Sequence, residues 1–273
     1  MKKLASLLLI AIAVITMASC NKEGNDADRI STMTESTVTH VLDGSNSSAT
    51  ATLGQTKVTI NRTQMKTSFT TEVTLGGTKY TIALNDLATT GDSERGIFTF
   101  TAASASSGNN TITDLTGTYN YYLDVVTLSY TVDSRYRVNT MNNSIIFQYG
   151  STEAKCDTAT FTQEGAIYNF TLKDGFKKAN LSMLEMRVNK SEGMIDRMEY
   201  EDVDVATTVN GFEITATDHG TVTDFKKPEN YTLKTAKFEI NMSAATMSGE
   251  FTIPGYSLKA SATLYKPAET SNK

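Results

Sequence analysis

The stretch KTAKFEINM, residues 234–242, decides the fold. Its apolar and polar side chains occupy alternate positions: Ala236, Phe238, Ile240 and Met242 alternate with Lys237, Glu239 and Asn241. Successive side chains of a β-strand point to opposite faces, so this pattern predicts a strand with one face on a core and the other in water. Strands of this kind are typical of antiparallel sheets. We therefore expect Phe238 and Ile240 to point inward and Lys237 and Glu239 to point outward.

The same period of two recurs along the chain from about Val38 onward. Residues 126–132, 168–172 and 212–217 show it clearly, and the abundance of Thr, Val and Ile also favours strands. Residues 176–187 are long enough for a short helix, but their alternation after position 183 favours a strand. Asn210-Gly211, between two alternating runs, is the clearest hairpin signal. The sequence predicts an all-β protein built from antiparallel sheets.

A weak internal repeat predicts two related units. The pattern G-x-x-Y-x-x-x-L-x-D occurs at residues 77–86 and again at residues 165–174. Strands use few residue types, so chance similarity between two hairpins is the alternative explanation. If the repeat is real, two small barrel or sandwich units meet near residues 140–144. We expect an N-terminal β-domain over 38–141 and a C-terminal β-domain over 142–268.

Residues 1–20, MKKLASLLLIAIAVITMASC, have the features of a lipoprotein signal peptide. Two lysines precede an apolar run that is too short for a comfortable membrane span, and small residues lead to Cys20. The end of this segment resembles a bacterial lipobox, with Met17 at the position where that pattern usually has Leu. We expect residues 1–19 to be removed and Cys20 to be acylated, with polar residues 20–37 as a flexible tether. An ordinary secretory signal that contains a cysteine is the alternative.

The composition of the chain limits the classes of molecule that it is expected to bind. The chain has 273 residues, of which 39% are hydrophobic, so it can form a core. Loss of the signal peptide takes the net charge from −5 to −7, because residues 1–19 contain Lys2 and Lys3 and no acid. An acidic chain without a basic cluster argues against nucleic acid and against electrostatic attraction to anionic lipid. Membrane attachment would then depend on the lipid at Cys20 itself.

The sequence contains no recognisable catalytic constellation. Nucleophile-elbow, zinc-protease and phosphate-loop motifs are missing, so we expect no enzymatic activity, metal or cofactor. His40 is expected to be partly buried in a strand, His219 to lie in a turn, and Cys156 to be a buried structural residue. The acidic run 199–204 is better explained as a solvated strand face than as a calcium site, since it lacks a ligand loop.

Two short segments are candidates for recognition or modification. Tyr119, Tyr121 and Tyr122 crowd together, so at least one must face outward; a surface recognition patch and ordinary edge tyrosines are both open. The chain has no Trp, which weighs against a carbohydrate cleft, although its twelve Tyr residues can substitute. Asp157-Thr158-Ala159 looks like the O-glycosylation acceptor of Bacteroidetes and makes Thr158 a possible glycosylation site.

One larger resemblance concerns the C-terminal half. The segment YNFTLKDGFKKANLSMLEMRVN, residues 168–189, with the Asn210-Gly211 hairpin and the strand at 237–242, looks like the calycin-like β-barrel domains of Bacteroidetes lipoproteins. The resemblance covers roughly residues 144–265. It implies a small ligand-holding barrel, anchored by lipid to the outer membrane and either periplasmic or surface-exposed, and it implies no known reaction.

These observations lead to three ordered hypotheses of function. The first is non-catalytic binding of a small apolar molecule or a glycan. The second is a structural or adhesive surface lipoprotein that engages another protein. The third is a glycoside or ester hydrolase, since carboxylate pairs from distant strands leave no local signature.

Overall fold

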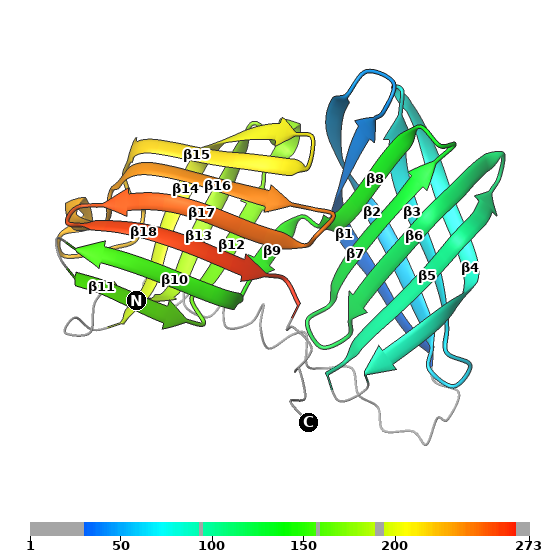
Figure 1. Ribbon diagram of the computed structural model, residues 1–273, viewed down its shortest axis with the longest axis horizontal. Coiled ribbons are helices and arrows are strands. Elements are labelled where there is room, and N and C mark those ends of the chain that lie inside the picture. Colours follow the sequence, from blue (N-terminus) through cyan, green and yellow to red (C-terminus); the bar gives the residue numbers. More distant parts are fainter. Residues whose placement is uncertain (1–29, 93–94, 157–158, 189–193, 266–273) are drawn as a thin grey trace, which may run out of the picture.

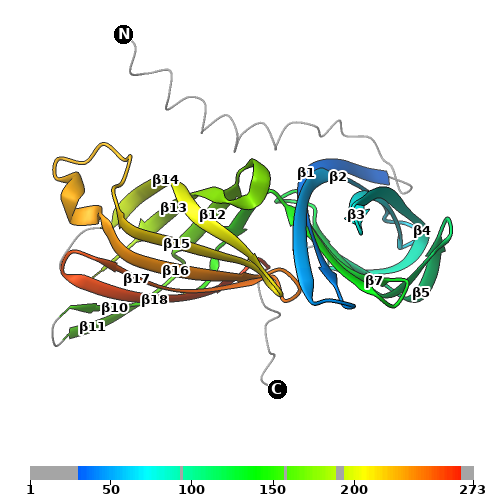
Figure 2. The same cartoon turned by 90° about the horizontal axis from the view of Figure 1, so that it is seen from above.

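The computed structural model describes residues 30–92, 95–156, 159–188 and 194–265, and nearly all of them lie in antiparallel sheet (Figure 1). Apart from strands it holds two short 3-10 turns, at Asp174–Phe176 and Pro228–Tyr231. The all-β prediction is confirmed. Within the described residues, no helix has the length and apolar character needed to cross a membrane. The strands form two units that lie side by side, and Figure 2 shows both from above.

The first unit is a closed barrel in which each strand pairs with the next and the last pairs with the first. Its strands are β1 (Ile30–Asp43), β2 (Ser48–Asn61), β3 (Lys66–Leu75), β4 (Thr78–Asp92), β5 (Ile97–Ser107), β6 (Asn110–Asn120), β7 (Val125–Val132) and β8 (Tyr136–Asn142). Closure gives every strand of this unit two neighbours, although residues 30–36 of β1 and 78–87 of β4 pair on one side only.

The barrel interior is packed with side chains. The rings of Phe69, Phe100 and Tyr130 are buried there, and Phe69 lies 6.1 Å from Phe100 and 6.4 Å from Tyr130. Buried threonines line one side of the interior and bond through their hydroxyls: Thr56 contacts Thr37 at 2.9 Å and Thr71 at 2.8 Å. A small eight-stranded barrel has an interior that side chains can fill, and here they form a core.

The second unit is a ten-stranded sheet that curls around its own core (Figure 2). Its strands are β9 (Ser144–Phe147), β10 (Tyr149–Cys156), β11 (Ala159–Glu164), β12 (Ile167–Leu172), β13 (Lys178–Met186), β14 (Ile195–Thr208), β15 (Gly211–His219), β16 (Leu233–Asn241), β17 (Thr246–Ile253) and β18 (Tyr256–Thr263). The spatial order is β11-β10-β18-β17-β16-β15-β14-β13-β12-β9, so β18 returns to pair with β10.

The register of β16 is the one that its sequence predicts. Phe238 and Ile240 are buried, and the Phe238 ring lies 5.4 Å from that of Phe170 and 5.5 Å from that of Phe251. Glu239 is exposed and forms an ion pair with Lys237 at 3.0 Å. The Asn210-Gly211 hairpin is also present, between β14 and β15.

Two expectations about the chain need correction. Residues 30–37, expected in the tether, form the first part of β1 and pair with residues 54–61 of β2. Their polar sequence hid the strand, because main-chain pairing with a neighbour does not require an apolar face. The repeat pattern also fails to mark equivalent positions: Tyr80 in β4 is 38% exposed, whereas Tyr168 in β12 is 1% exposed.

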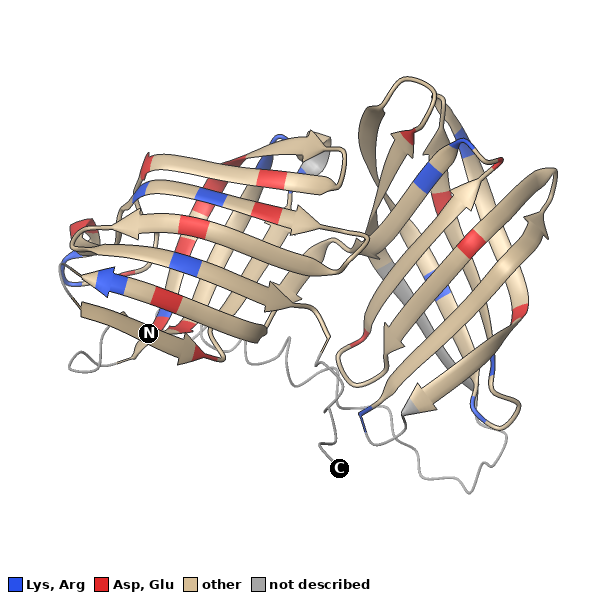
Figure 3. Ribbon diagram, in the orientation of Figure 1, with Lys and Arg blue, Asp and Glu red and all other residues tan. Residues whose placement is uncertain are grey.

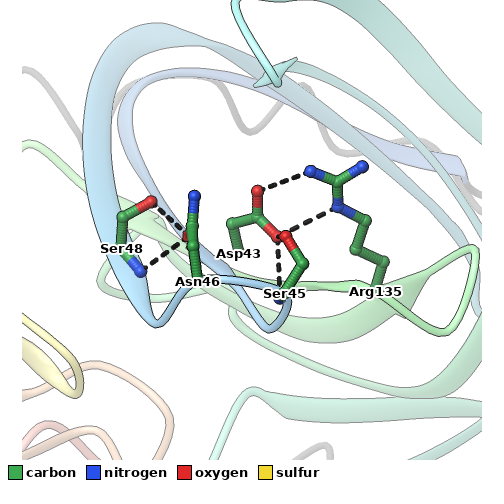
Figure 4. Close-up of polar contacts among 5 residues, drawn as sticks. All are labelled: Asp43, Ser45, Asn46, Ser48 and Arg135. Carbon is green, nitrogen blue, oxygen red and sulfur yellow. Dashed lines mark hydrogen bonds and ion pairs between the residues drawn. The ribbon is translucent and has the colours of Figure 1, made fainter.

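One end of the barrel is held by a charged turn (Figure 4). The Asp43 carboxylate accepts hydrogen bonds from the backbone N–H of Ser45 (2.9 Å) and from its hydroxyl (2.7 Å). Arg135, from the turn between β7 and β8, donates to the same carboxylate through Nε (3.0 Å) and Nη2 (2.8 Å). These bonds hold the pKa of Asp43 well below its usual range, and they join the β1–β2 turn to the β7–β8 turn.

Candidate functional site

The candidate site lies where β14 loses its second strand neighbour. β15 pairs with β14 only at residues 204–208, so the first part of β14 has a free edge on that side. The loop that follows β15 covers this edge through Glu199: its carbonyl accepts from the N–H of Val222 (2.9 Å) and the hydroxyl of Thr221 (2.8 Å). The N–H of Glu199 donates to Thr223 Oγ1 (2.9 Å). The loop thus takes the place of a strand.

The same loop and the start of β14 line an open surface hollow of about 600 Å³, which we call the loop pocket. Its lining is partly apolar and partly charged: Met194, Ile195, Asp196, Arg197, Thr223, Phe225 and Tyr231. The rings of Phe225 and Tyr231 lie 4.1 Å apart, with their planes at 32°. An aromatic pair of this kind provides a broad, firm apolar surface.

Tyr200 fixes the main chain of Tyr231, one of the two aromatic residues of the loop pocket. This phenol is buried, and it donates a hydrogen bond to the backbone carbonyl of Tyr231 (2.6 Å). Burial raises the pKa of Tyr200, so its hydroxyl stays protonated and keeps donating. The bond ends on the main chain of Tyr231, and the rings of Phe225 and Tyr231 also pack against the core of this unit, so both contacts anchor the loop.

The polar part of the pocket comes from two adjacent residues of β14. Arg197 is half-buried and paired with Glu199, while Asp196 is exposed. Adjacent side chains of a strand point to opposite faces, so Arg197 shares the face of its partner Glu199, and Asp196 lies at the exposed start of the strand. The Arg197 guanidinium and the nearby aromatic rings give donors and an apolar platform to the pocket. This combination fits a ligand that carries both hydroxyl groups and an apolar ring face.

The acidic run on β14 is a solvated face, as expected. Asp202 pairs with Lys173 and Asp204 with Lys178, each at 2.6 Å, and both carboxylates are well exposed. The hydrogen bond from Lys173 lowers the pKa of Asp202. Figure 3 shows that acidic and basic residues alternate across the strands of this unit. In the part of the chain that the structure describes, no three His, Cys, Asp or Glu side chains are grouped to hold a metal ion.

The tyrosine patch is smaller than the sequence predicts. Tyr119 is only 3% exposed, so its place in the patch is wrong: the alternation of β6 turns it inward, where its hydroxyl donates to Asp124 (2.9 Å). Tyr122 is 58% exposed, and its ring lies 5.6 Å from that of Tyr121. Arg62, which the sequence gave no reason to select, lies over the Tyr121 ring at 4.4 Å.

The remaining residues singled out from the sequence are scattered. His40 was expected to be partly buried and is fully buried between the two units. Cys156 was expected to be buried and is a half-buried free thiol, because it lies at the end of β10. His219 ends β15 and bonds through Nε2 to the carbonyl of Glu201 (2.6 Å). Cys20 and Thr158 lie outside the described residues.

The loop pocket was missed from the sequence for a clear reason. Its residues come from the start of β14 and from a loop about thirty positions later, and the two parts share no local motif. One signal was available: Phe225 and Tyr231 are the aromatic residues of an otherwise polar segment, residues 218–232, that also contains Gly220 and Pro228. Aromatic side chains in a polar, turn-rich segment favour either anchoring of the loop or recognition.

Comparisons with known proteins add little. No protein-family model matches the chain, and no curated protein matches its sequence. Among solved structures, the isotype 1 transferrin-binding protein B from serogroup B Neisseria meningitidis is similar with a TM-score of 0.27 and 7% sequence identity. The match covers 86% of this chain and 75% of that protein. A likeness this loose carries no information about what the present chain binds.

Proposed function

We propose that this protein is a lipid-anchored envelope protein that binds a glycan, without catalysis, in the loop pocket. The anchor would be the acylated Cys20, at the outer membrane of a cell of the Bacteroidetes type, facing the periplasm or the exterior. The observation that carries the binding role is the Phe225–Tyr231 pair beside Asp196 and Arg197.

The chemistry of the pocket favours a glycan over a purely apolar molecule. A sugar ring presents one face of C–H groups, which packs on aromatic rings, and an edge of hydroxyls, which bonds to charged side chains. A purely apolar ligand would cover Asp196 without giving it a partner and would remove the Arg197–Glu199 ion pair from water, and that desolvation is unfavourable. The packed barrel interior also leaves the loop pocket as the better place for a ligand.

The lowered pKa values of three carboxylates outside the loop pocket relate to the stability of the fold. Among the described residues, the pKa values of Asp43, Asp202 and Glu250 are lowered, in each case by a hydrogen bond from Arg or Lys. A general acid for glycoside cleavage needs a raised pKa instead. These carboxylates are arranged to stay charged and to stabilise the fold.

The test is a binding assay with the mature protein that lacks residues 1–19. A panel of bacterial and host glycans is screened, and each hit is titrated against the wild type and the Phe225→Ala variant. Loss of one stacked ring should weaken binding about three- to tenfold. Tyr80→Ala, which removes an exposed ring from the barrel, is the matched control and should bind as the wild type does. Equal affinity of wild type and Phe225→Ala for every hit would contradict the proposal.

A second candidate function is the engagement of another protein at the barrel end. Tyr122 and Leu123 are 58% and 39% exposed, and Arg62 lies over the ring of the neighbouring Tyr121. Tyr and Arg are enriched among the residues that dominate protein interfaces. If this patch mediates adhesion, Tyr122→Ala should reduce cell attachment while Phe225→Ala leaves it unchanged; the reverse pattern favours the loop pocket.

A further inference from the structure

The two units touch through the outer face of β1 and β8, where Val38 and Met141 are buried in the apolar core of the second unit. They also touch through the turn between β14 and β15. His40 on β1 donates through Nε2 to the backbone carbonyl of Thr208 (2.7 Å). Arg137 on β8 donates through Nη2 to the next carbonyl, that of Val209 (3.2 Å). We call these two side chains and two carbonyls the latch.

A second set of contacts lies beside the chain connection between the units. The N–H of Asn143, between β8 and β9, donates to the carbonyl of Ser36 (3.0 Å). The hydroxyl of Tyr265, just after β18, donates to the carbonyl of Thr118 (3.3 Å) and contacts Thr127 Oγ1 at 3.2 Å. This contact, which we call the pivot, contains no acidic or basic side chain.

The hydrogen bond in the latch fixes the tautomer of His40. A carbonyl only accepts, so Nε2 carries the proton and Nδ1 of the neutral ring is bare. His40 is fully buried, and its Nδ1 has no hydrogen-bond partner among the described residues. In this structure a second proton would therefore sit on a buried nitrogen with no hydrogen-bond partner in place, which is unfavourable. The amide oxygen of Asn139, opposite His40 on β8, is also without a partner and does not bond to the ring here.

The surroundings of His40 make a positive charge still less favourable. Arg137 is the charged group that acts on it, from β8, and β8 also places the uncharged Asn139 directly opposite. From the second unit, β15 presents the ring of Phe212 edge-on at 6.2 Å and β14 presents only the Thr208 carbonyl. Burial and Arg137 lower the pKa of His40, against the opposing effect of the Thr208 bond.

We propose that the latch is a pH-sensitive contact: protonation of His40 releases the β14–β15 turn from the barrel, and the second unit swings on the pivot. In the closed form the latch bonds are made, and the buried His40 ring does not take up a second proton. In the open form His40 is exposed and takes up this proton at its ordinary pKa of 6.5. The closed form is thus fully favoured above pH 6.5 and loses that advantage as the pH falls below it. By pH 5 the equilibrium shifts toward the open form by up to about thirtyfold.

Electron-spin distance measurements test this directly. Spin labels are placed at Thr50→Cys on β2 and Val209→Cys in the β14–β15 turn of the mature protein, in a background in which both native cysteines are replaced, Cys20→Ser and Cys156→Ser. At pH 7.5 we expect one narrow distance distribution, and at pH 5.0 a second population at longer distance. A single unchanged distribution across this range would overturn the proposal.

Three variants separate the latch from general acid unfolding. His40→Gln keeps an N–H donor for Thr208 but cannot take up a proton, so its distances should not depend on pH. Arg137→Gln removes the like charge but also a latch bond, so its reference is its own distance distribution at pH 7.5; the change from pH 7.5 to pH 5.0 should be smaller than in the wild type. His219→Gln alters the other histidine, away from the latch, and should open as the wild type does. Opening of His40→Gln at pH 5.0 equal to that of the wild type would contradict the role of His40.

Discussion

Neighbouring residues of this protein can lie in opposite environments, as Phe238 and Glu239 on β16 illustrate. Phe238 is buried among Tyr168, Phe170 and Phe251, whereas Glu239 lies on the wet face beside Lys237. The free energy of unfolding should therefore respond very differently to changes at two adjacent positions.

We predict that Phe238→Ala lowers the free energy of unfolding by about 3–5 kcal/mol, because it removes a buried ring and leaves a cavity. Glu239→Ala should change it by no more than about 0.5 kcal/mol. Denaturant melts of the mature protein measure both, with coincident spectroscopic probes to establish two-state unfolding. Equal losses for the two variants would show that the register of β16 is wrong.

The Asp43–Arg135 pair gives a prediction on acid stability. The bonds that lower the pKa of Asp43 stabilise the fold above its unfolded value of 3.8, and this contribution is lost as the pH falls further. Asp43→Asn should be less stable than the wild type at pH 7, and the difference should shrink from pH 4 to pH 2. Urea melts at several pH values measure it. A difference that stays constant over this range would exclude the ion pair as the cause.

At the scale of elements, the alternation of apolar and polar residues was sufficient to predict most strands. It did not predict which strands pair with each other. Residues 126–132 and 168–172 correspond closely to β7 and β12, since one buried face imposes a period of two. The first part of β1 has a mostly polar sequence without this alternation and was missed. The loop pocket was missed because its two parts become neighbours only when β14 and β15 diverge, and local sequence does not record this.

Pairing between strands also explains a glycine that alternation alone leaves unexplained. Gly249 on β17 lies opposite Phe238, and a Cβ there would come within 2.2 Å of the Phe238 ring. Gly249→Ala should therefore destabilise the protein by about 1–3 kcal/mol through overpacking. Ser248→Ala, at the adjacent exposed position, is the control for the same denaturant melts. A Gly249→Ala protein as stable as the control would mean that the ring moves freely.

For the whole molecule, the account combines two β-units with an anchor that lies outside the described residues. We predict that Cys20→Ser abolishes lipid attachment, because the thiol is the group that carries the lipid. Metabolic labelling with a fatty acid, followed by cell fractionation, tests this. Equal labelling of the wild type and the variant would exclude Cys20 as the anchor.

The central claim is that a glycan binds in the loop pocket. Amide chemical shifts of the mature protein, recorded during titration with the best glycan of the panel, test it most directly. We predict that the signals that move belong to Ile195, Arg197, Thr223, Phe225 and Tyr231, while those of the barrel stay in place. Movement confined to Tyr121 and Tyr122, or no movement with any glycan, would contradict the claim.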